Sequence, residues 1–165
     1  MSWVGGISFD DSNHVFIADI ERQTNHHRME SFSNVVATGM RRVCAAFSQI
    51  VMPYGFKPQK GRKWVRESEP FEEIIWISRS GATYGAPHSP SISLQLSLTS
   101  IRLRDEQRTD LSHHESGLIR RSTGYCYHHR FNAKTNSTYE RCLDELELFV
   151  TEVAETWFEQ QRRQI

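Results

Sequence analysis

The sequence is poor in cysteine, has no net charge and contains no long hydrophobic run. A membrane-spanning helix needs roughly 18 or more consecutive apolar residues, and no stretch approaches that length, so we expect no membrane partner. The 20 basic and 20 acidic residues cancel, so overall charge favours no class of partner. The three cysteines form no close pair, and the N-terminus lacks the basic start and apolar core of a signal peptide. These features predict reduced thiols and a cytoplasmic protein.

The motifs of common enzymes are also absent. The sequence has no Gly-x-Ser-x-Gly elbow, no phosphate loop ending in Gly-Lys-Ser or Gly-Lys-Thr, and no Gly-x-Gly-x-x-Gly fingerprint. Ser112, His113 and Glu115 have the residue types of a catalytic triad, but contiguous residues rarely converge on one point. We therefore expect a non-enzymatic protein without catalytic residues or cofactors.

The segment 119–131 contains two residues that could bind a metal ion. This segment alternates as a strand would, which places Cys126 and His128 on one face. Zinc takes three or four protein ligands, and the missing ones have no marked position. We expect no metal ligands and a polar, solvated strand face instead.

The stretch 74–104 contains the clearest pattern in the chain. Residues 91–99 alternate strictly, with Leu94 and Leu96 on one face and polar residues on the other. Residues 74–77 are apolar on both faces, which is typical of a strand inside a sheet. The apolar parity changes after Leu98, which predicts a bulge near residues 99–100.

Two helices are predicted on either side of this stretch. Apolar residues recur every three or four positions over 32–52, and Pro53 and Gly55 end that helix. Gly39 in its middle costs about 1 kcal/mol against alanine, so we expect a close packing contact there. A second helix is predicted over 138–161.

The predicted fold is α+β and forms one domain over residues 1–165. It has an antiparallel sheet of four or more strands with the N-terminal and C-terminal helices packed on one face. Ser137 and Glu140 fit a capping box at the start of the last helix. Residues 105–117 read as a loop. A hairpin is expected within residues 1–30, where residues 7–9 and 15–20 flank a turn-like Asp-Asp-Ser-Asn sequence.

Charge is segregated along the chain. The last helix is strongly acidic, and its Glu145, Glu152 and Glu159, spaced by seven, are expected to steer a partner electrostatically. The region 57–66 is basic and contains Trp64, which is compatible with contacts to nucleic-acid phosphates. The alternative is that both patches are solvated surface, or that they face each other.

One aromatic residue is expected on the polar face of the sheet. If alternate residues of 74–77 face the helices, Ile74 and Trp76 must emerge on the other side, beside Gln95. An exposed Trp on a flat, uncharged polar surface is typical of recognition sites. The alternative is that the N-terminal hairpin or loop 80–91 covers this face.

Four short motifs follow one another along the chain: Pro53-Tyr-Gly-Phe-Lys57, Trp64-Val-Arg66, Ile75-Trp-Ile-Ser-Arg-Ser80 and Glu155-Thr-Trp-Phe-Glu159. By the order of these motifs, the chain resembles the bacterial domain-of-unknown-function 4304 family over about residues 35–160. The resemblance implies a small bacterial α+β domain of accessory or immunity-like type and brings no catalytic residues.

These observations predict a bacterial protein-binding domain. The leading hypothesis is an immunity protein that neutralises a toxin by direct binding. One alternative is a nucleic-acid-binding or nucleic-acid-processing domain that uses the basic 57–66 region with His113, His114 and His128. Another is an adaptor or sensor whose pocket lies between the sheet and the helices.

Overall fold

The structure is a computed structural model that describes the backbone of residues 12–81 and 88–164, with side chains from Phe32 onward. A sheet of six strands is combined with helices that precede, interrupt and follow it. The elements in chain order are α1 (Ser12–Val51), the 3₁₀ turn η1 (Met52–Tyr54), β1 (Lys57–Gln59), β2 (Lys63–Ser68), β3 (Phe71–Arg79), β4 (Ser91–Arg102), β5 (Gln107–Leu111), α2 (His113–Leu118), β6 (Arg130–Asn132), α3 (Tyr139–Phe149), the π-helical segment η3 (Val150–Ala154) and α4 (Glu155–Arg162).

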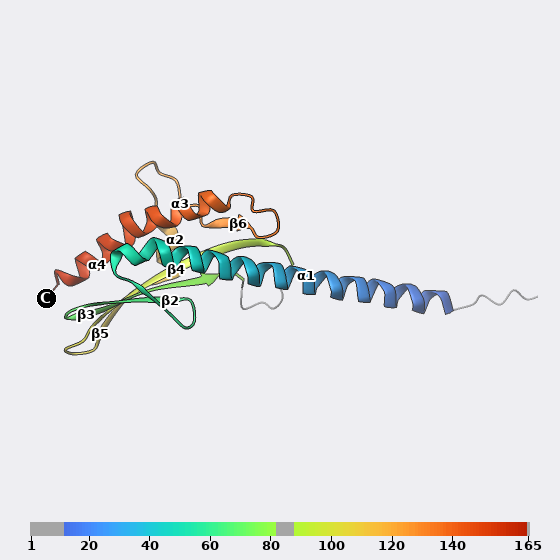
Figure 1. The fold of residues 1–165 in the computed structure, drawn as a ribbon, viewed down its shortest axis with the longest axis horizontal. Coiled ribbons are helices and arrows are strands. Elements are labelled where there is room, and N and C mark those ends of the chain that lie inside the picture. Colours follow the sequence, from blue (N-terminus) through green and yellow to red (C-terminus); the bar gives the residue numbers. More distant parts are fainter. Residues whose placement is uncertain (1–11, 82–87, 165) are drawn as a thin grey trace, which may run out of the picture.

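The helices α1, α3 and α4 lie on one side of the sheet (Figure 1). Phe47 of α1, Ile75 of β3, Leu96 of β4 and Phe149 of α3 are buried in one cluster between the two layers. Burying a side chain of this size contributes about 1.5–3 kcal/mol. The predicted α+β fold is confirmed, with two main helices on the face that carries Leu94 and Leu96. Among the described residues, no helix combines the length and the apolar character needed to cross a membrane.

The sheet is antiparallel throughout. Its strands follow the order β1-β2-β3-β4-β5, and β6 pairs with the start of β4. The register between β3 and β4 runs without interruption from Phe71 opposite Arg102 to Arg79 opposite Leu94. The bulge predicted near residues 99–100 is therefore wrong.

The apolar pattern changes after Leu98 because polar and charged residues take the next positions on the helix-covered face of the sheet. Ser100 continues on that face opposite Glu73, and both residues are buried. Glu73 accepts hydrogen bonds from Arg66 and Arg162, each at 2.6 Å. A buried polar cluster thus replaces the next apolar pair of the face.

The N-terminal hairpin prediction is wrong where the structure tests it. Residues 15–20, predicted as a strand, lie in α1, which begins at Ser12 and so starts well before the predicted residue 32. No glycine or proline interrupts the sequence between residues 12 and 38, so nothing there stops a helix from propagating. Residues 7–9, the other predicted strand, lie outside the described residues.

The end of α1 and its central glycine agree with prediction. The helix ends at Val51, and Gly55 adopts a positive φ of 85° after the 3₁₀ turn. A Cβ at Gly39 would lie 2.7 Å from Ala133 Cβ and 2.8 Å from Ile92 Cδ1. The close packing contact expected at Gly39 is confirmed.

The last helical stretch spans the predicted residues but starts differently. Thr138 precedes α3 with a positive φ of 61° and makes no side-chain cap, so the capping box predicted at Ser137 and Glu140 is wrong. The Thr138 hydroxyl instead donates to the Arg130 carbonyl oxygen at 2.9 Å. Tertiary contact with β6 therefore takes the place of local capping.

Two segments between β4 and α3 also differ from prediction. Residues 105–117, predicted as a loop, contain β5 and most of α2. Ser112 and Glu115 form the capping box of α2, which explains why these residue types lie together. The predicted strand over 119–131 is wrong for most of its length, because the chain turns back at residues 121–124, where Arg120 and Cys126 form an isolated bridge, and only β6 pairs with β4.

Candidate functional site

The side of the sheet opposite the helices carries alternate residues of β2, β3, β4 and β5. Trp76 lies there with 37% of its surface exposed, opposite Lys63 of β2 and Ser97 of β4. The Lys63 ammonium lies 5.4 Å from the centre of the Trp76 ring, within range of a cation–π interaction. The predicted emergence of Trp76 on this face agrees with the structure.

A shallow hollow of about 580 Å³ lies beside Trp76. Arg62, Ser97, Thr99 and Arg108 contribute to its lining. The residues come from the 61–62 turn and from β4 and β5, so the hollow follows from strand pairing across the sheet. We call the exposed surface on this side of the sheet the Trp76 face. It comprises Trp76, the hollow and the neighbouring basic residues.

Ile74 does not contribute to this surface, contrary to expectation. It is 5% exposed, because β3 lies inside the sheet and Val65 and Thr99 flank Ile74 directly on the two neighbouring strands. Gln95 is half-buried on the same side of β4 as Ser97, which pairs with Trp76. Gln95 therefore remains beside Trp76 as predicted, whereas Ile74 is part of the interior.

The N-terminal segment was one of two alternatives for covering the Trp76 face. From Ser12 onward this segment is α1, whose C-terminal half lies on the opposite side of the sheet and whose N-terminal half extends beyond the sheet (Figure 1). Residues 1–11, and residues 82–87 of the other candidate loop, lie outside the described part of the chain.

The acidic residues predicted to steer a partner have different environments. Glu145 is 6% exposed, and its carboxylate accepts from Arg121 at 2.9 Å, so its expected exposure is wrong. Glu152 is exposed and accepts from the Tyr127 hydroxyl at 2.6 Å. Glu159 is exposed and pairs with Arg163 one helical turn away. These helices lie across the sheet from Trp76, so the acidic residues and Trp76 belong to different surfaces (Figure 1).

The basic region 57–66 is divided between the two sides of the sheet. Arg66 faces the helices, donates to Glu73 and Glu155, and its guanidinium lies 4.3 Å from the Phe56 ring. Trp64 is buried and its indole N–H donates to Ser48 at 2.8 Å. One alternative was that the basic region 57–66 and the acidic last helix face each other. The contact between Arg66 and Glu155 confirms this for these two residues. Trp64 is unavailable for stacking on a base.

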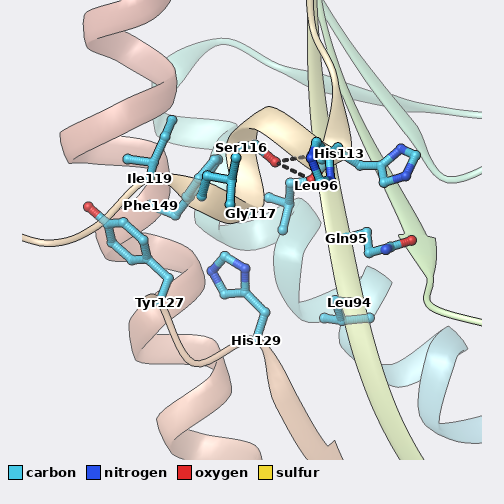
Figure 2. A pocket seen from close by; sticks show the side chains of 12 residues that line it. Leu94, Gln95, Leu96, His113, Ser116, Gly117, Ile119, Tyr127, His129 and Phe149 are labelled. Carbon is cyan, nitrogen blue, oxygen red and sulfur yellow. Dashed lines mark hydrogen bonds between the residues drawn. The ribbon is translucent and has the colours of Figure 1, made fainter. Parts of the chain in front are cut away.

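A second cavity, of about 290 Å³, lies between β4, α2 and α3 (Figure 2). The rings of Tyr127 and His129 stack at 5.9 Å, and Phe149 meets both rings edge-on. Burial lowers the pKa of His129 to about 4, so its ring is neutral at pH 7. The adaptor or sensor alternative expected a pocket between the sheet and the helices, but the residues of this cavity were not predicted, because most of α2 lies in the segment 105–117 that was predicted as a loop.

Cys126, which shares a strand face with His128 in the sequence pattern, is exposed, and its sulfur lies 3.5 Å from Arg120 Nη1. Among the side chains of residues 32–81 and 88–164, no group of three or more His, Cys, Asp or Glu is arranged to hold a metal ion. His113 is exposed and lies at the borders of both cavities.

Comparison with known proteins gives no match: no family model, no curated protein and no solved structure is significantly similar to the chain. The resemblance to the domain-of-unknown-function 4304 family stays a prediction. Function must be argued from the geometry of the described surfaces.

Proposed function

We propose that this chain is a non-enzymatic protein-binding domain that docks its partner on the Trp76 face. The observation that carries the proposal is the exposed indole of Trp76 beside a hollow on the side of the sheet opposite the helices. Protein interfaces concentrate their binding energy in a few Trp, Tyr and Arg side chains surrounded by polar groups. Trp76 has such surroundings in Ser97 and Gln95.

The charges beside Trp76 favour an acidic partner. Lys57, Lys60 and Arg62 are exposed, and none of them forms an ion pair with another described residue. Unpaired basic residues at the rim of an interface speed the encounter with an acidic surface. This assignment replaces the acidic last helix as the source of steering, because Glu145 is buried and the helix lies across the sheet.

The proposed biological role is that of a bacterial immunity protein that neutralises a toxin by direct binding. A small α+β domain without catalytic motifs and the resemblance to the domain-of-unknown-function 4304 family support this role. The partner would then be a toxin domain with an acidic surface patch complementary to the Trp76 face.

Nucleic-acid binding is the competing function, and one observation weighs against it. Sites for single strands use several aromatic side chains on which successive bases stack. The described part of the Trp76 face has a single exposed aromatic residue, since Trp64 is buried.

The test is an affinity measurement with the purified product of a neighbouring gene. Trp76→Ala is expected to weaken binding at least about 30-fold, equal to about 2 kcal/mol, mainly through faster dissociation. Tyr125→Ala is the matched control, because Tyr125 is also an exposed aromatic residue but lies away from the sheet. An unchanged affinity in Trp76→Ala contradicts the proposal. So does a Trp76-dependent affinity for single-stranded oligonucleotides without a protein partner.

A further inference from the structure

The cavity of Figure 2 exists because one edge of β4 is incompletely paired. On this edge β6 pairs with residues 91–93 and β5 pairs with residues 98–102, which leaves residues 94–97 without a described strand partner. The carbonyl oxygen of His129 accepts from the Leu94 amide at 2.8 Å, and the Ser116 hydroxyl of α2 donates to the Leu96 carbonyl oxygen. The segment 127–129 and α2 therefore close the gap from two sides and leave a space between them.

One backbone donor in this gap has no partner among the described residues. In an antiparallel ladder the N–H and C=O groups of one residue point to the same edge. The Leu96 carbonyl oxygen is engaged by Ser116, whereas the Leu96 amide donates to no described residue. Leu96 is 2% exposed, and backbone amides in the interior are almost always hydrogen-bonded, so a ligand or water acceptor is expected there.

The walls of the cavity combine apolar side chains with imidazole, amide and hydroxyl groups. Leu94, Ile119 and Phe149 supply apolar surface, and none of the twelve lining residues is Asp, Glu, Lys or Arg. The ring of His129 points from the 127–129 segment toward α2 and into the space beside β4 (Figure 2). A charged ligand would lose its hydration here without gaining a carboxylate, lysine or arginine partner.

The segment behind these walls has an unusual backbone. Phe149 is followed directly by the π-helical segment η3, which contains Glu152. The Glu152 carboxylate accepts from the Tyr127 hydroxyl and so fixes the Tyr127 ring against Phe149. π-helical turns are rare and occur frequently at functional sites. Here the π-helical segment places both the Phe149 wall and the Tyr127 anchor.

We propose that this cavity binds a small, uncharged aromatic ring compound whose acceptor atom receives the Leu96 amide hydrogen. A volume of about 290 Å³ lies near the lower end of the range for small-molecule sites and accommodates one or two fused rings. Tyr127, His129 and Phe149 contact its ring, and Leu96 fixes its orientation. This cavity borders the proposed protein-docking surface at His113 and Gln95 but is a distinct hollow, and it gives the domain the capacity to sense a small molecule.

Quinoline is a suitable probe, because it is a neutral two-ring compound with one acceptor nitrogen. Its binding is followed by NMR chemical shifts of the full-length chain. We expect a Kd of about 1 mM or tighter, a large downfield shift of the Leu96 amide, and intermolecular NOEs to Phe149 and His129. Quinoline-4-carboxylate and N-methylquinolinium share the ring but carry a charge, so we expect each to bind at least about tenfold more weakly.

Gly117 provides the variant that closes the site. It lines the cavity, its φ is not positive, and a Cβ at this position would meet no atom within 4 Å, so Gly117→Leu is expected to fold. We expect Gly117→Leu to weaken quinoline binding at least about tenfold by filling the space. Ser122→Leu, at an exposed position outside the cavity, is the control and is expected to bind as the unmodified chain does.

Several outcomes overturn the proposal. Quinoline that does not bind at millimolar concentration, or whose NOEs come from other residues, contradicts the site. Equal affinity for the charged relatives contradicts the ligand class. Unchanged affinity in a folded Gly117→Leu variant contradicts the cavity as the place of binding. None of these results bears on whether Trp76 docks a protein.

Discussion

The two sides of the sheet carry the same kind of ion pair in different surroundings. On the helix-covered side, Arg66 donates to Glu73 at 2.6 Å, and the Glu73 side chain is fully buried. On the other side, Arg108 pairs with Asp110 at 2.7 Å, and both side chains are about half exposed. Removing one partner of a buried pair leaves an uncompensated charge, whereas exposed pairs are screened by water. Burial, and not the chemistry of the pair, therefore decides which contact stabilises the fold.

The apolar residues differ between the two sides in the same way. Leu94, Leu96 and Leu98 on β4 are buried under the helices, while Ser93, Gln95 and Ser97 alternate with them on the other side. The covered side thus supplies stability, whereas the other side exposes the Trp76 indole, where we propose that a partner docks. Substitutions on the two sides are expected to separate these roles.

The largest effect is expected for Arg66. Arg66→Ala removes contacts to Glu73, Glu155 and the Tyr54 carbonyl oxygen, so we expect unfolding free energy to fall by about 3–5 kcal/mol. The matched variant Arg108→Ala is expected to lose less than about 1 kcal/mol. Urea unfolding of both variants measures the difference. Equal losses would show that burial does not distinguish the two pairs.

The second largest loss of stability is expected for a substitution of Leu96. Leu96→Ala deletes a buried side chain between β4 and the helices and is expected to cost roughly 2–5 kcal/mol. Its neighbour Ser97 faces the other side, and Ser97→Ala is expected to change stability by less than about 0.5 kcal/mol. A loss below about 0.5 kcal/mol for Leu96→Ala in thermal or urea unfolding is incompatible with the core described above.

Acidification is expected to have a smaller effect through His129. Its pKa is lowered by burial to about 4, against an ordinary value of 6.5, so the unfolded chain binds the proton more readily between these pH values. The contribution of neutral His129 to the unfolding free energy is therefore fully present above pH 6.5 and is lost as the pH falls toward 4. Between pH 7 and 5 this loss is roughly 1–2 kcal/mol. His129→Gln is expected to lose less over the same interval in urea unfolding, and an equal loss excludes His129 as the source.

The sequence predicted the parts of the fold that depend on local periodicity. Apolar residues alternate over residues 91–99 and recur every three or four positions after Phe32. These two patterns indicate which side of the strand and of the helix is buried, so the helix-covered face of the sheet could be predicted. The position of Trp76 on the other side of the sheet followed from the same alternation. The Ile residues on either side of it in β3 face the helices, so Trp76 must face the opposite side. The close contact at Gly39 followed from the cost of glycine in a helix.

Contacts between distant residues could not be predicted in this way. Glu73 looks like a surface residue in sequence, and its partner Arg162 lies 89 residues later in α4. The cavity beside β4 depends on where β5 and β6 end along one strand edge, which no local pattern specifies. Glu145 has the helical spacing of an exposed charge, but Arg121 and the segment around His128 cover it.

The most direct test of the central claim is a side-chain oxidation footprint of the chain alone and with its bound protein partner. Trp76 and Tyr125 are both exposed and oxidisable, and Tyr125 lies away from the sheet, so it serves as an internal control. We predict that the partner slows oxidation of Trp76 severalfold and leaves Tyr125 unchanged. Unchanged oxidation of Trp76 in the complex, with protection confined to α3 and α4, would contradict the assignment of docking to the Trp76 face.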